Sequence, residues 1–414
     1  MSVWEVFRQR GFFQQATDME ALEARSGEGP ITGYIGFDPT ADSFHAGHLI
    51  PLMALLHFQR EGHRPIALLG GGTAMIGDPT GKNEMRKMLS VEELDGNIAA
   101  LRKQLGRLLD FEQGAVLVDN AEWLRGLHYI DFLREVGPHF SVNRMLTFET
   151  FKMRLDGPGL SFIEFNYPLL QSYDFLELQR RYGCILQMGG DDQWANIISG
   201  VDLVRRMDRK TVFGLTFPLL TLASGAKMGK TEAGAVWLDA EKTSPYQYFQ
   251  HWVNIGDADV EKCLKLFTLL PLEEIARLAR LQGAELREAK AVLAHEATKL
   301  IHGEAEAHKA RAGAQAVFGI AGAPGGQDGA MDDVPTTKLA QGRLEGGLLL
   351  TEILTEVGLA KSKSEVRRLI QQGGVSVNAV RVEDQAFSVT TAQAEQGAIL
   401  LRVGKKKFHR LLLG

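Results

Sequence analysis

Short apolar stretches alternate with longer segments of helical periodicity over the first half of the chain. Each stretch is four to eight residues long, and several lead into a glycine-containing turn. Runs of this length are typical of buried strands, and strands that alternate with helices predict a parallel α/β sheet. The predicted strands are residues 31–37, 66–69, 115–118, 185–188 and 212–219. Because ligands bind at the carboxyl ends of such strands, polar residues after them are candidates for one shared site.

The hydrophobic pattern changes at about residue 245. The α/β domain is therefore expected to cover residues 1–222, with a connecting loop over 223–244. Residues 245–319 have the periodicity of amphipathic helices and predict a helical domain. Residues 320–347 are rich in Gly, Pro and Asp and predict a flexible linker. Residues 348–414 contain two helical and two strand-like segments, which predict a small α+β domain.

The composition excludes several classes of protein. Hydrophobic residues make up 45% of the 414 residues and charged residues 23%, as in ordinary globular domains. No apolar run approaches the ~20 residues that cross a bilayer. The first 27 residues lack the layout of a signal peptide and predict an amphipathic helix. Cys184 and Cys263 are the only cysteines, so we expect a cytoplasmic protein with no disulfide framework and no structural zinc.

The charge is unevenly distributed along the chain. Residues 341–414 hold eleven Lys/Arg and seven Asp/Glu, a local charge of +4, which leaves −9 for the rest of a chain whose total is −5. An acidic body with a basic end predicts that any nucleic acid is held partly by the C-terminal domain. A basic run is more often a solvated face, but two runs in one small domain favour phosphate contacts. The candidates are Lys361, Lys363, Arg367, Arg368, Arg402, Lys405, Lys406 and Lys407.

Two histidines lie three residues apart in the sequence HAGH, residues 45–48. Asp42 or Ser43 is expected to cap a helix that begins here and runs to about Phe58. The spacing places both imidazoles on one face of the first turn, beside backbone N–H groups that favour an oxyanion such as phosphate. Gly47 would let a ligand approach the backbone closely. Two surface histidines that cap a helix are the alternative.

Two lysines, Lys227 and Lys230, lie in the glycine-containing sequence KMGKT after a strand-like segment. Such a loop can clamp a polyphosphate and neutralise the charge that develops on a leaving group. A solvated basic loop is the alternative. The earlier sequence GDPTGKN is not a phosphate-binding P-loop, because Ile76 stands where that motif requires glycine. Asp78 in this turn can still face a ligand.

Tyr167, Gln171 and Asp174 recur on one face of a predicted helix. Apolar neighbours flank this polar stripe, which favours the wall of a pocket, and an exposed helix face is the alternative. Paired glycines and the sequence DDQ follow the strand at 185–188. These carboxylate and amide groups suit ribose hydroxyls or an ammonium group. A metal site is the competing interpretation, but no histidine lies close in sequence to support it.

In this order and spacing, the motifs resemble those of the class I aminoacyl-tRNA synthetases. HAGH is similar to the family signature HIGH, and KMGKT is similar to KMSKS. The resemblance is strongest to the bacterial members that act on tyrosine and covers essentially the whole chain, through GYIGFDPTADSFHAGH, FNYPLLQSYDF and QMGGDDQWANI. It implies a Rossmann-like catalytic domain, a helical anticodon-side domain and an S-four-like RNA-binding domain. Ala46, Gly229 and Thr231 depart from the signatures but leave the donor groups in place.

The resemblance implies roles for the matching residues. The substrate tyrosine would be bound by Tyr34, Asp78, Tyr167, Gln171, Asp174 and Gln187, with Tyr34 and Asp174 at the phenol. ATP would be bound by Gly36, Asp38, Thr40, His45, Gly47, His48, Gly189, Asp192, Gln193, Met228 and Lys230. The catalytic donors would be Thr40, His45, His48, Lys227, Lys230 and Thr231.

The implied reaction has two steps. Attack by the tyrosine carboxylate on the α-phosphorus of ATP gives tyrosyl-adenylate and pyrophosphate, and tyrosine then passes to the 3′ end of tRNA(Tyr). Because a carboxylate is already a nucleophile at neutral pH, positioned donors rather than a general base would supply catalysis. Mg²⁺ would accompany ATP on its phosphates. The resemblance further implies a homodimer. A tryptophan enzyme is the nearest rival, and the pair Tyr34 and Asp174 favours tyrosine.

Overall fold

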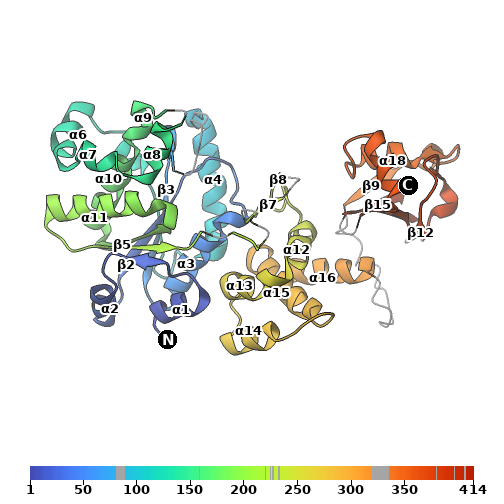
Figure 1. Ribbon diagram of the computed structural model, residues 1–414, viewed down its shortest axis with the longest axis horizontal. Coiled ribbons are helices and arrows are strands. Elements are labelled where there is room, and N and C mark those ends of the chain that lie inside the picture. Colours follow the sequence, from blue (N-terminus) through green and yellow to red (C-terminus); the bar gives the residue numbers. More distant parts are fainter. Residues whose placement is uncertain are drawn as a thin grey trace. The chain divides into compact units, whose positions relative to one another are not determined.

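The computed structural model describes most of the chain (Figure 1). The described residues are 1–80, 89–157, 159–219, 221–223, 225, 228–231, 234–318, 335–378, 380–395, 397–404 and 407–414. They fall into two units, residues 1–243 with 256–289 and residues 244–255 with 290–414. No described helix is long and apolar enough to cross a membrane.

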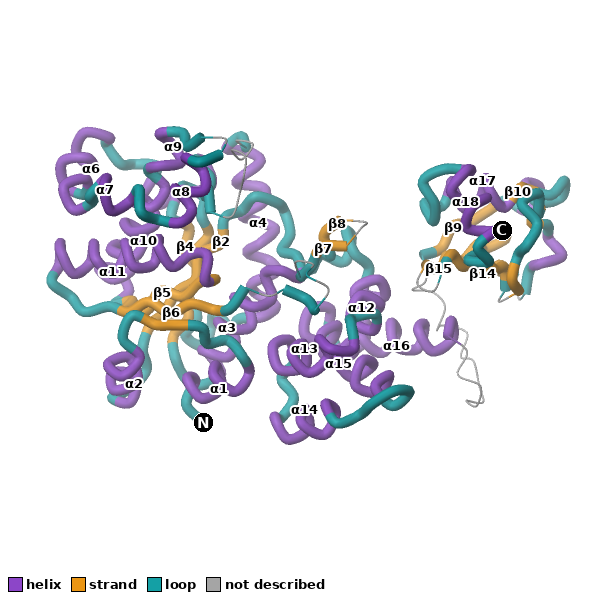
Figure 2. The backbone as a smooth tube through the Cα atoms, in the orientation of Figure 1, coloured by secondary structure: helices purple, strands orange, loops and turns teal. Residues whose placement is uncertain are grey.

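The first unit is built on a six-stranded sheet, drawn in orange at the centre of that unit in Figure 2. The strand order is β1–β6–β5–β2–β3–β4, and every neighbouring pair is parallel except β1 with β6. This confirms the predicted parallel α/β sheet, because all five predicted strands are present. The strands are β1 (Gln15–Ala16), β2 (Thr32–Phe37), β3 (Arg64–Leu69), β4 (Val116–Asp119), β5 (Cys184–Gly190) and β6 (Phe213–Phe217).

Helices cover both faces of this sheet. Successive residues of a strand point to opposite faces, so the neighbours of Gly33 and Tyr34 on β2 identify the two layers. A Cβ atom added to Gly33 would lie 3.1 Å from the ring of Phe58 on α3 (Leu49–Arg60). The ring of Tyr34 packs against Phe175 of α10 (Tyr167–Tyr182), with centroids 5.4 Å apart. Helices α3 and α10 therefore lie on opposite faces of the sheet.

The remaining helices of the first unit extend these layers. The predicted N-terminal helix is instead two helices separated by β1. The helices are α1 (Val3–Arg10), α2 (Met19–Gly27), α4 (Val91–Leu108), α5 (Ala121–Leu124), α6 (Tyr129–Glu135), α7 (Val142–Met145), α8 (Glu149–Leu155), α9 (Phe162–Phe165), α11 (Trp194–Asp208), α13 (Val260–Phe267) and α14 (Leu272–Ala279).

Helices α13 and α14 belong to the first unit, although the sequence pattern assigned them to the helical domain. The buried side chain of Arg10 on α1 explains this difference. Its guanidinium donates hydrogen bonds to the carbonyl groups of Lys265, Thr268 and Leu270, at 3.1, 2.9 and 2.6 Å. These bonds satisfy the end of α13 and hold it to α1, a long-range contact that helical periodicity does not reveal.

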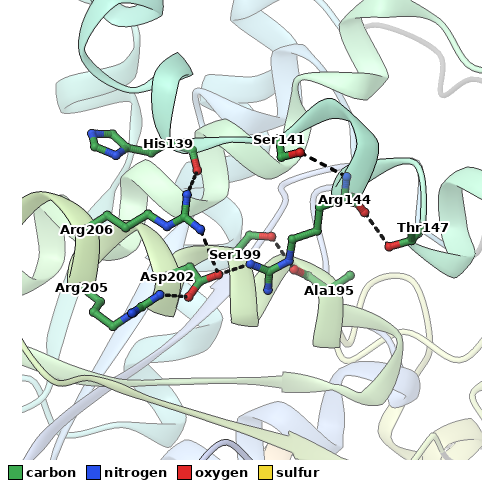
Figure 3. Close-up of polar contacts among 9 residues, drawn as sticks. All are labelled: His139, Ser141, Arg144, Thr147, Ala195, Ser199, Asp202, Arg205 and Arg206. Atoms are coloured by element: carbon green, nitrogen blue, oxygen red, sulfur yellow. Dashed lines mark hydrogen bonds and ion pairs between the residues drawn. The ribbon is translucent and has the colours of Figure 1, made fainter.

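Asp202 of α11 connects that helix to α7 through a cluster of three arginines (Figure 3). Its carboxylate accepts hydrogen bonds from Arg144 of α7 and, at 3.1 Å, from Arg205, and it pairs with Arg206 at 4.0 Å. Partial burial opposes ionisation, but the arginines outweigh it and lower the pKa of Asp202. Arg206 also donates to the carbonyl of His139 at 2.8 Å. The cluster therefore fixes α11, which begins at the carboxyl end of β5.

In its described residues, the second unit consists of helices α12 (Pro245–Val253), α15 (Leu286–His302, which starts within the first unit's residues) and α16 (Glu304–Phe318), followed by a small α+β domain. The α+β domain has a sheet of order β12–β11–β14–β15–β9. Its elements are β9 (Thr336–Leu339), α17 (Leu350–Glu356), α18 (Lys363–Gln371), β11 (Val375–Val377), β12 (Val380–Arg381), β14 (Ala398–Val403) and β15 (Lys407–Leu413), with a separate two-stranded sheet of β10 (Leu348–Leu349) and β13 (Ser388–Val389).

The predicted linker over 320–347 is wrong in its last part. Strand β9 comes from this segment and pairs in parallel with β15, with Thr336 opposite Arg410 and Leu339 opposite Leu413. Leu339 is 4% exposed and belongs to the core of the small domain. The Gly- and Asp-rich composition around β9 masked a short edge strand, because its partner lies about seventy residues later in the chain. Residues 320–334 of the predicted linker lie outside the described residues.

Candidate active site

A cavity of about 780 Å³ opens at the carboxyl ends of the central strands of the first unit. This is the position expected for a ligand in a parallel α/β sheet. The structure brings sixteen of the predicted site residues together around it. They are Tyr34, Gly36, Asp38, Thr40, His45, Gly47, His48, Asp78, Tyr167, Gln171, Asp174, Gln187, Gly189, Asp192, Gln193 and Met228.

The HAGH turn lies on one wall of the cavity, and its geometry corrects the predicted cap. The first turn is a 3-10 helix, η1 (Ala46–His48), that continues into α3. Neither Asp42 nor Ser43 caps it, because the Ser43 hydroxyl donates to the carbonyl of Phe44 at 2.7 Å and Asp42 pairs with Lys242. His45 is the N-cap residue, and its own ring accepts the backbone N–H of the turn.

Backbone hydrogen bonds fix the tautomer of both histidines. The Nδ1 atom of His45 accepts the N–H of Gly47 at 3.0 Å. The Nδ1 atom of His48 accepts the N–H of His45 at 3.2 Å. A neutral imidazole that accepts at Nδ1 carries its proton on Nε2. The centroids of the two rings lie 4.0 Å apart, and both residues line the cavity. The turn therefore places two Nε2–H donors on one wall.

Gly47 and Gly229 allow the KMGKT segment to pack on the HAGH turn. A Cβ atom at Gly47 would lie 2.8 Å from the His45 ring, so the glycine makes room for this ring rather than only for a ligand. Gly229 has φ +77°, and a Cβ atom there would lie 2.6 Å from the backbone nitrogen of Gly47. The HAGH turn also bonds to the segment after the KMGKT sequence, because the Ala46 N–H donates to the carbonyl of Val236 at 2.8 Å. The two signature segments therefore form one wall.

The lysine loop is described only in part. Lys227 lies outside the described residues. Lys230 and Thr231 form the short strand β7 (Lys230–Thr231), which pairs with β8 (Gly234–Ala235), but their side chains lie outside the described part of the structure. The roles expected of these three residues remain predictions.

Asp174 lies at the buried base of the cavity, at 2% exposure. Its two carboxylate oxygens accept hydrogen bonds from Trp123 Nε1 at 2.8 Å and Asn120 Nδ2 at 2.9 Å. Burial raises the pKa of Asp174 to about 8, although both hydrogen bonds act in the opposite direction. Tyr34 is also buried, and its hydroxyl has no hydrogen-bond partner among the described residues. A phenol of a ligand at this base would satisfy that hydroxyl.

Asp38 and Tyr167 form a second polar group on the cavity wall. The Asp38 carboxylate accepts from the Tyr167 hydroxyl at 3.0 Å and from Thr73 Oγ1 at 2.9 Å. Burial and the nearby carboxylates of Asp38 and Asp78 raise the pKa of Tyr167 well above its usual value. A tyrosine hydroxyl that stays protonated beside two acidic groups is suited to a cationic ligand group.

Gln193 joins the polar stripe of α10 to the turn that follows β3. Its Nε2 atom donates to Asp78 at 2.7 Å, and its Oε1 atom accepts from Asn196 at 3.0 Å and from Gln171 at 3.4 Å. The Asp78 carboxylate also accepts the backbone N–H of Thr80 at 2.9 Å. Tyr167, Gln171 and Asp174 all line the cavity, so the predicted polar stripe is a pocket wall and not an exposed helix face.

Sequence reasoning missed Asn120, Trp123 and Thr73. Asn120 is 1% exposed and links three groups, since it donates to Asp174 and to Thr73 Oγ1 at 3.0 Å and accepts the N–H of Gly72 at 2.7 Å. A signal was present, because Asp119 and Asn120 directly follow the predicted strand at 115–118. Trp123 offered no such signal, since a tryptophan after a strand is usually part of an apolar core.

The predicted RNA-binding residues lie in the second unit, and none of those that the structure describes is among the residues that line this cavity. Lys361, Lys363, Arg367 and Arg368 are exposed on or beside α18. Lys363 pairs with Glu352 at 2.6 Å. Arg402 on β14 lies over the ring of Phe408, 5.5 Å from its centroid. Lys405 and Lys406 lie outside the described residues, as does the side chain of Lys407.

Comparison with known proteins identifies two families along the chain. Residues 26–319 match the family described as tRNA synthetases class I (W and Y). Residues 327–411 match the tyrosine--tRNA ligase SYY-like C-terminal domain. The second match begins before β9, in agreement with the sheet of the small domain.

Curated relatives match over the whole chain. A tyrosine--tRNA ligase of Caldanaerobacter subterraneus subsp. tengcongensis is 55% identical over 414 residues, which cover 100% of both chains. A tyrosine--tRNA ligase of Clostridium botulinum is 52% identical over 413 residues, 100% of this chain and 99% of the relative.

Solved structures match the fold. A C-terminally truncated mitochondrial tyrosyl-tRNA synthetase of Aspergillus nidulans superposes with a TM-score of 0.69 at 32% identity, over 77% of this chain and 94% of the other. A tryptophanyl-tRNA synthetase of Encephalitozoon cuniculi superposes with a TM-score of 0.56 at 16% identity, over 74% and 86% of the two chains. The second likeness concerns the fold alone.

Proposed function

Because this chain belongs to the class I tRNA synthetases of the tryptophan and tyrosine group, we propose that its cavity holds tyrosine and ATP side by side and joins them. The chain is a tyrosine--tRNA ligase, which activates tyrosine with ATP and transfers it to tRNA. The main support for the proposed site is that a tyrosine-binding region and a phosphate-binding region line the same cavity. A buried carboxyl group and a phenol at the base, those of Asp174 and Tyr34, line the same space as the two histidines on its wall.

The base of the cavity recognises the tyrosine side chain. The substrate phenol bonds to Asp174 and Tyr34, and it completes the hydrogen bonding of the Tyr34 hydroxyl. Asp78, Tyr167 and Gln171 hold the substrate ammonium group, with Gln187 nearby. Asp38 contacts Tyr167 and Thr73, which places its carboxylate near the substrate ammonium group. We prefer this position to the one expected beside the ATP phosphates, because a carboxylate would repel them.

The HAGH wall binds the phosphates of ATP. The Nε2–H groups of His45 and His48 donate to oxygens on which negative charge grows as the bond from the α-phosphorus to pyrophosphate breaks. The tyrosine carboxylate attacks without a general base, so the chain contributes position and charge rather than proton transfer. Lys227 and Lys230 neutralise the charge of the departing pyrophosphate, and the Thr231 hydroxyl stabilises it by hydrogen bonding. Asp192 contacts the ribose, and Gln193 lies beside the reacting carboxylate.

Mg²⁺ would accompany ATP, bound chiefly by its phosphates, and would neutralise part of their charge. The described carboxylates that line the cavity are spaced along its wall, and no three of them lie close enough together to form a metal site of their own. Such a donor set suits a cation that arrives on its substrate and neutralises phosphate charge. Because translation takes place in the cytoplasm, we assign the enzyme to that compartment, and two free, buried cysteines fit its reducing conditions.

Amino-acid-dependent exchange of pyrophosphate into ATP tests the activity. Exchange is expected with tyrosine and not with phenylalanine or tryptophan, because only a phenol satisfies Tyr34 and Asp174 together. Exchange that requires tryptophan instead would contradict the assignment of the cavity base.

The tRNA is held partly by the basic face of α18. Arg367 and Arg368 are exposed and have no ion-pair partner among the described residues. Replacing both with alanine is expected to weaken tRNA binding and to lower the slope of log Kd against log salt concentration by about 2, since each contact releases about one counterion. Filter binding over a salt series measures this slope.

A matched arginine in the same domain provides the control. Arg343 pairs with Glu356 through two bonds of 2.8 Å, so its charge is already neutralised. Arg343→Ala is expected to leave the salt dependence unchanged, and adenylation is expected to be unaffected in both variants. An unchanged slope in the double variant would place the tRNA contact on another face.

The chain forms a homodimer through an apolar surface on α6 to α9. Of the thirteen large apolar side chains exposed in the described part of the chain, seven fall within residues 129–162. These helices gather at one end of the first unit (Figure 1). This concentration of exposed apolar side chains on four helices supports a twofold interface that buries them against a second copy of the chain. The residues are Tyr129, Ile130, Val142, Leu146, Met153, Leu155 and Phe162.

Phe162→Asp is expected to raise the dimer dissociation constant roughly 30-fold or more, because Phe162 is 69% exposed in one chain and a buried charge replaces an aromatic anchor. Sedimentation velocity over a dilution series measures this constant. Val380→Asp is the control, since Val380 is 70% exposed but lies in the second unit. Equal dissociation of both variants, or a wild-type monomer, would contradict the interface.

A further inference from the structure

Two histidines and a glutamate converge where α15 turns into α16. Helix α15 ends at His302, Gly303 adopts φ +89°, and α16 begins at Glu304. His295 lies about two turns before the end of α15, and His308 lies one turn after Glu304 on α16. The turn at Gly303 separates the two helices, and the three side chains come together beside it. All of these residues belong to the second unit, outside the catalytic cavity.

One carboxylate oxygen lies between the two imidazoles. Glu304 Oε1 is 3.2 Å from His295 Nε2 and 3.1 Å from His308 Nε2. The ligand atoms of the three residues all lie within 4.8 Å of one another, and the two rings are 4.9 Å apart. Among the described residues, these are the only three His, Cys, Asp or Glu side chains that converge in this way.

These separations match the edges of a metal coordination tetrahedron. Imidazole nitrogen and carboxylate oxygen bind Zn²⁺ at about 2.0–2.1 Å, so two ligands of one tetrahedron lie roughly 3.3 Å apart. The two nitrogen–oxygen distances already have nearly this value. We propose that His295, Glu304 and His308 bind a zinc ion that joins α15 to α16. Two imidazoles and one carboxylate suit Zn²⁺ and leave its fourth position for water.

The neighbours of the three ligands set the expected strength of binding. Lys299 Nζ lies 2.6 Å from the other carboxylate oxygen, Glu304 Oε2, so it orients the carboxylate and leaves Oε1 toward the histidines. His295 is 9% exposed, but its Nδ1 atom has no hydrogen-bond partner among the described residues. Strong zinc sites usually hold this second nitrogen with an outer partner. We therefore expect micromolar rather than nanomolar affinity.

The site differs from the zinc sites that the sequence excluded. Two cysteines excluded thiolate coordination, and from this we expected no structural zinc. The proposed ligands are imidazoles and a carboxylate on two helices. Their spacing in the sequence matches no common zinc motif, because the turn at Gly303 determines which residues meet.

Calorimetric titration of the metal-free, full-length protein with zinc chloride tests the proposal. One zinc ion per chain is expected to bind at this site and to raise the thermal unfolding midpoint by several degrees. His308→Ala and Glu304→Gln are each expected to lower that affinity at least about 10-fold and to abolish the thermal shift. Both side chains are about half exposed or more, so the variants should fold. Cobalt absorption in the visible range, lost in the variants, reports the ligands directly.

The control replaces a histidine outside the cluster. His128 is exposed and makes no side-chain cap hydrogen bond, so His128→Ala should bind zinc as the wild type does. Variants are needed because His45 and His48 offer two further imidazoles, and total zinc uptake does not distinguish the two places. Zinc affinity that is equal in wild type, His308→Ala and Glu304→Gln would overturn the proposal, as would the absence of saturable binding.

Discussion

Asp174→Ala is expected to lower kcat/KM for tyrosine in pyrophosphate exchange by roughly 10³-fold. The variant loses the acceptor for the substrate phenol and leaves the buried N–H groups of Asn120 and Trp123 without a partner. A site built to hydrogen-bond a substrate hydroxyl strongly rejects an analogue that lacks this hydroxyl, and tyrosine-specific enzymes are a known example. The preference for tyrosine over phenylalanine should fall by a similar factor, because phenylalanine never made the bond.

Asp174→Asn provides the sharper comparison. The amide has nearly the shape of the carboxylate, but its NH₂ group must face one of the two N–H donors that now bond to the carboxylate. We therefore expect most of the loss to remain in this variant. Asn196→Ala, which removes only a partner of Gln193, should cost much less. Near-normal tyrosine selectivity in Asp174→Asn would show that the phenol binds elsewhere.

The pKa of Asp174 gives the same variant a pH signature. Burial raises this pKa from its usual 3.8 to about 8, so between these values the folded protein holds a proton that the unfolded chain has released. The contribution of Asp174 to the free energy of unfolding is therefore present below about pH 4 and is lost as the pH rises to about 8. Thermal midpoints of wild type should fall relative to Asp174→Asn across this window. A constant difference would mean that the carboxyl ionises normally.

His45→Ala is expected to slow adenylate formation by about 10²–10³-fold, with little change in the affinity for tyrosine. A lost transition-state donor in a pre-formed site has this magnitude. The donor is assigned to Nε2 because Nδ1 accepts the N–H of Gly47. Single-turnover formation of enzyme-bound tyrosyl-adenylate measures the rate, and equilibrium dialysis measures tyrosine binding.

Two further variants separate the roles of the two ring nitrogens. In His45→Asn, the side-chain oxygen lies near the position of Nδ1 and can still accept from Gly47, but no donor remains at Nε2. In His45→Gln, the longer amide brings an N–H group near the position of Nε2. Partial rescue by Gln and not by Asn is expected. The reverse order would show that His45 acts by holding the turn, and equal loss of tyrosine affinity would place it in the amino-acid site.

Much of the catalytic domain could be predicted from the sequence. Each strand is a short apolar run. Acidic residues follow β2 and β5 directly, and Asp78 lies in the glycine-rich segment that follows β3. Parallel strands place their carboxyl ends at one edge, so Asp38, Asp78 and Asp192 had to approach one another whatever the details of packing. Local patterns were less reliable at residues 42–48. Ser43 was expected to cap the helix, but its hydroxyl bonds to the carbonyl of Phe44, and the ring of His45 caps the turn instead.

The sequence by itself determined the succession of strands and helices along the catalytic domain, the edge of the sheet at which ligands bind, and the family. These features follow from periodicity and from motifs that are local in the chain. The tertiary structure alone decided which side chains meet. It brought Asn120 and Trp123 to Asp174, paired β9 with β15, and set His295 beside Glu304 and His308. These contacts join residues that are distant in sequence or separated by a turn. Their pKa values, tautomers and ligand geometry depend on burial and distance, which no linear pattern encodes.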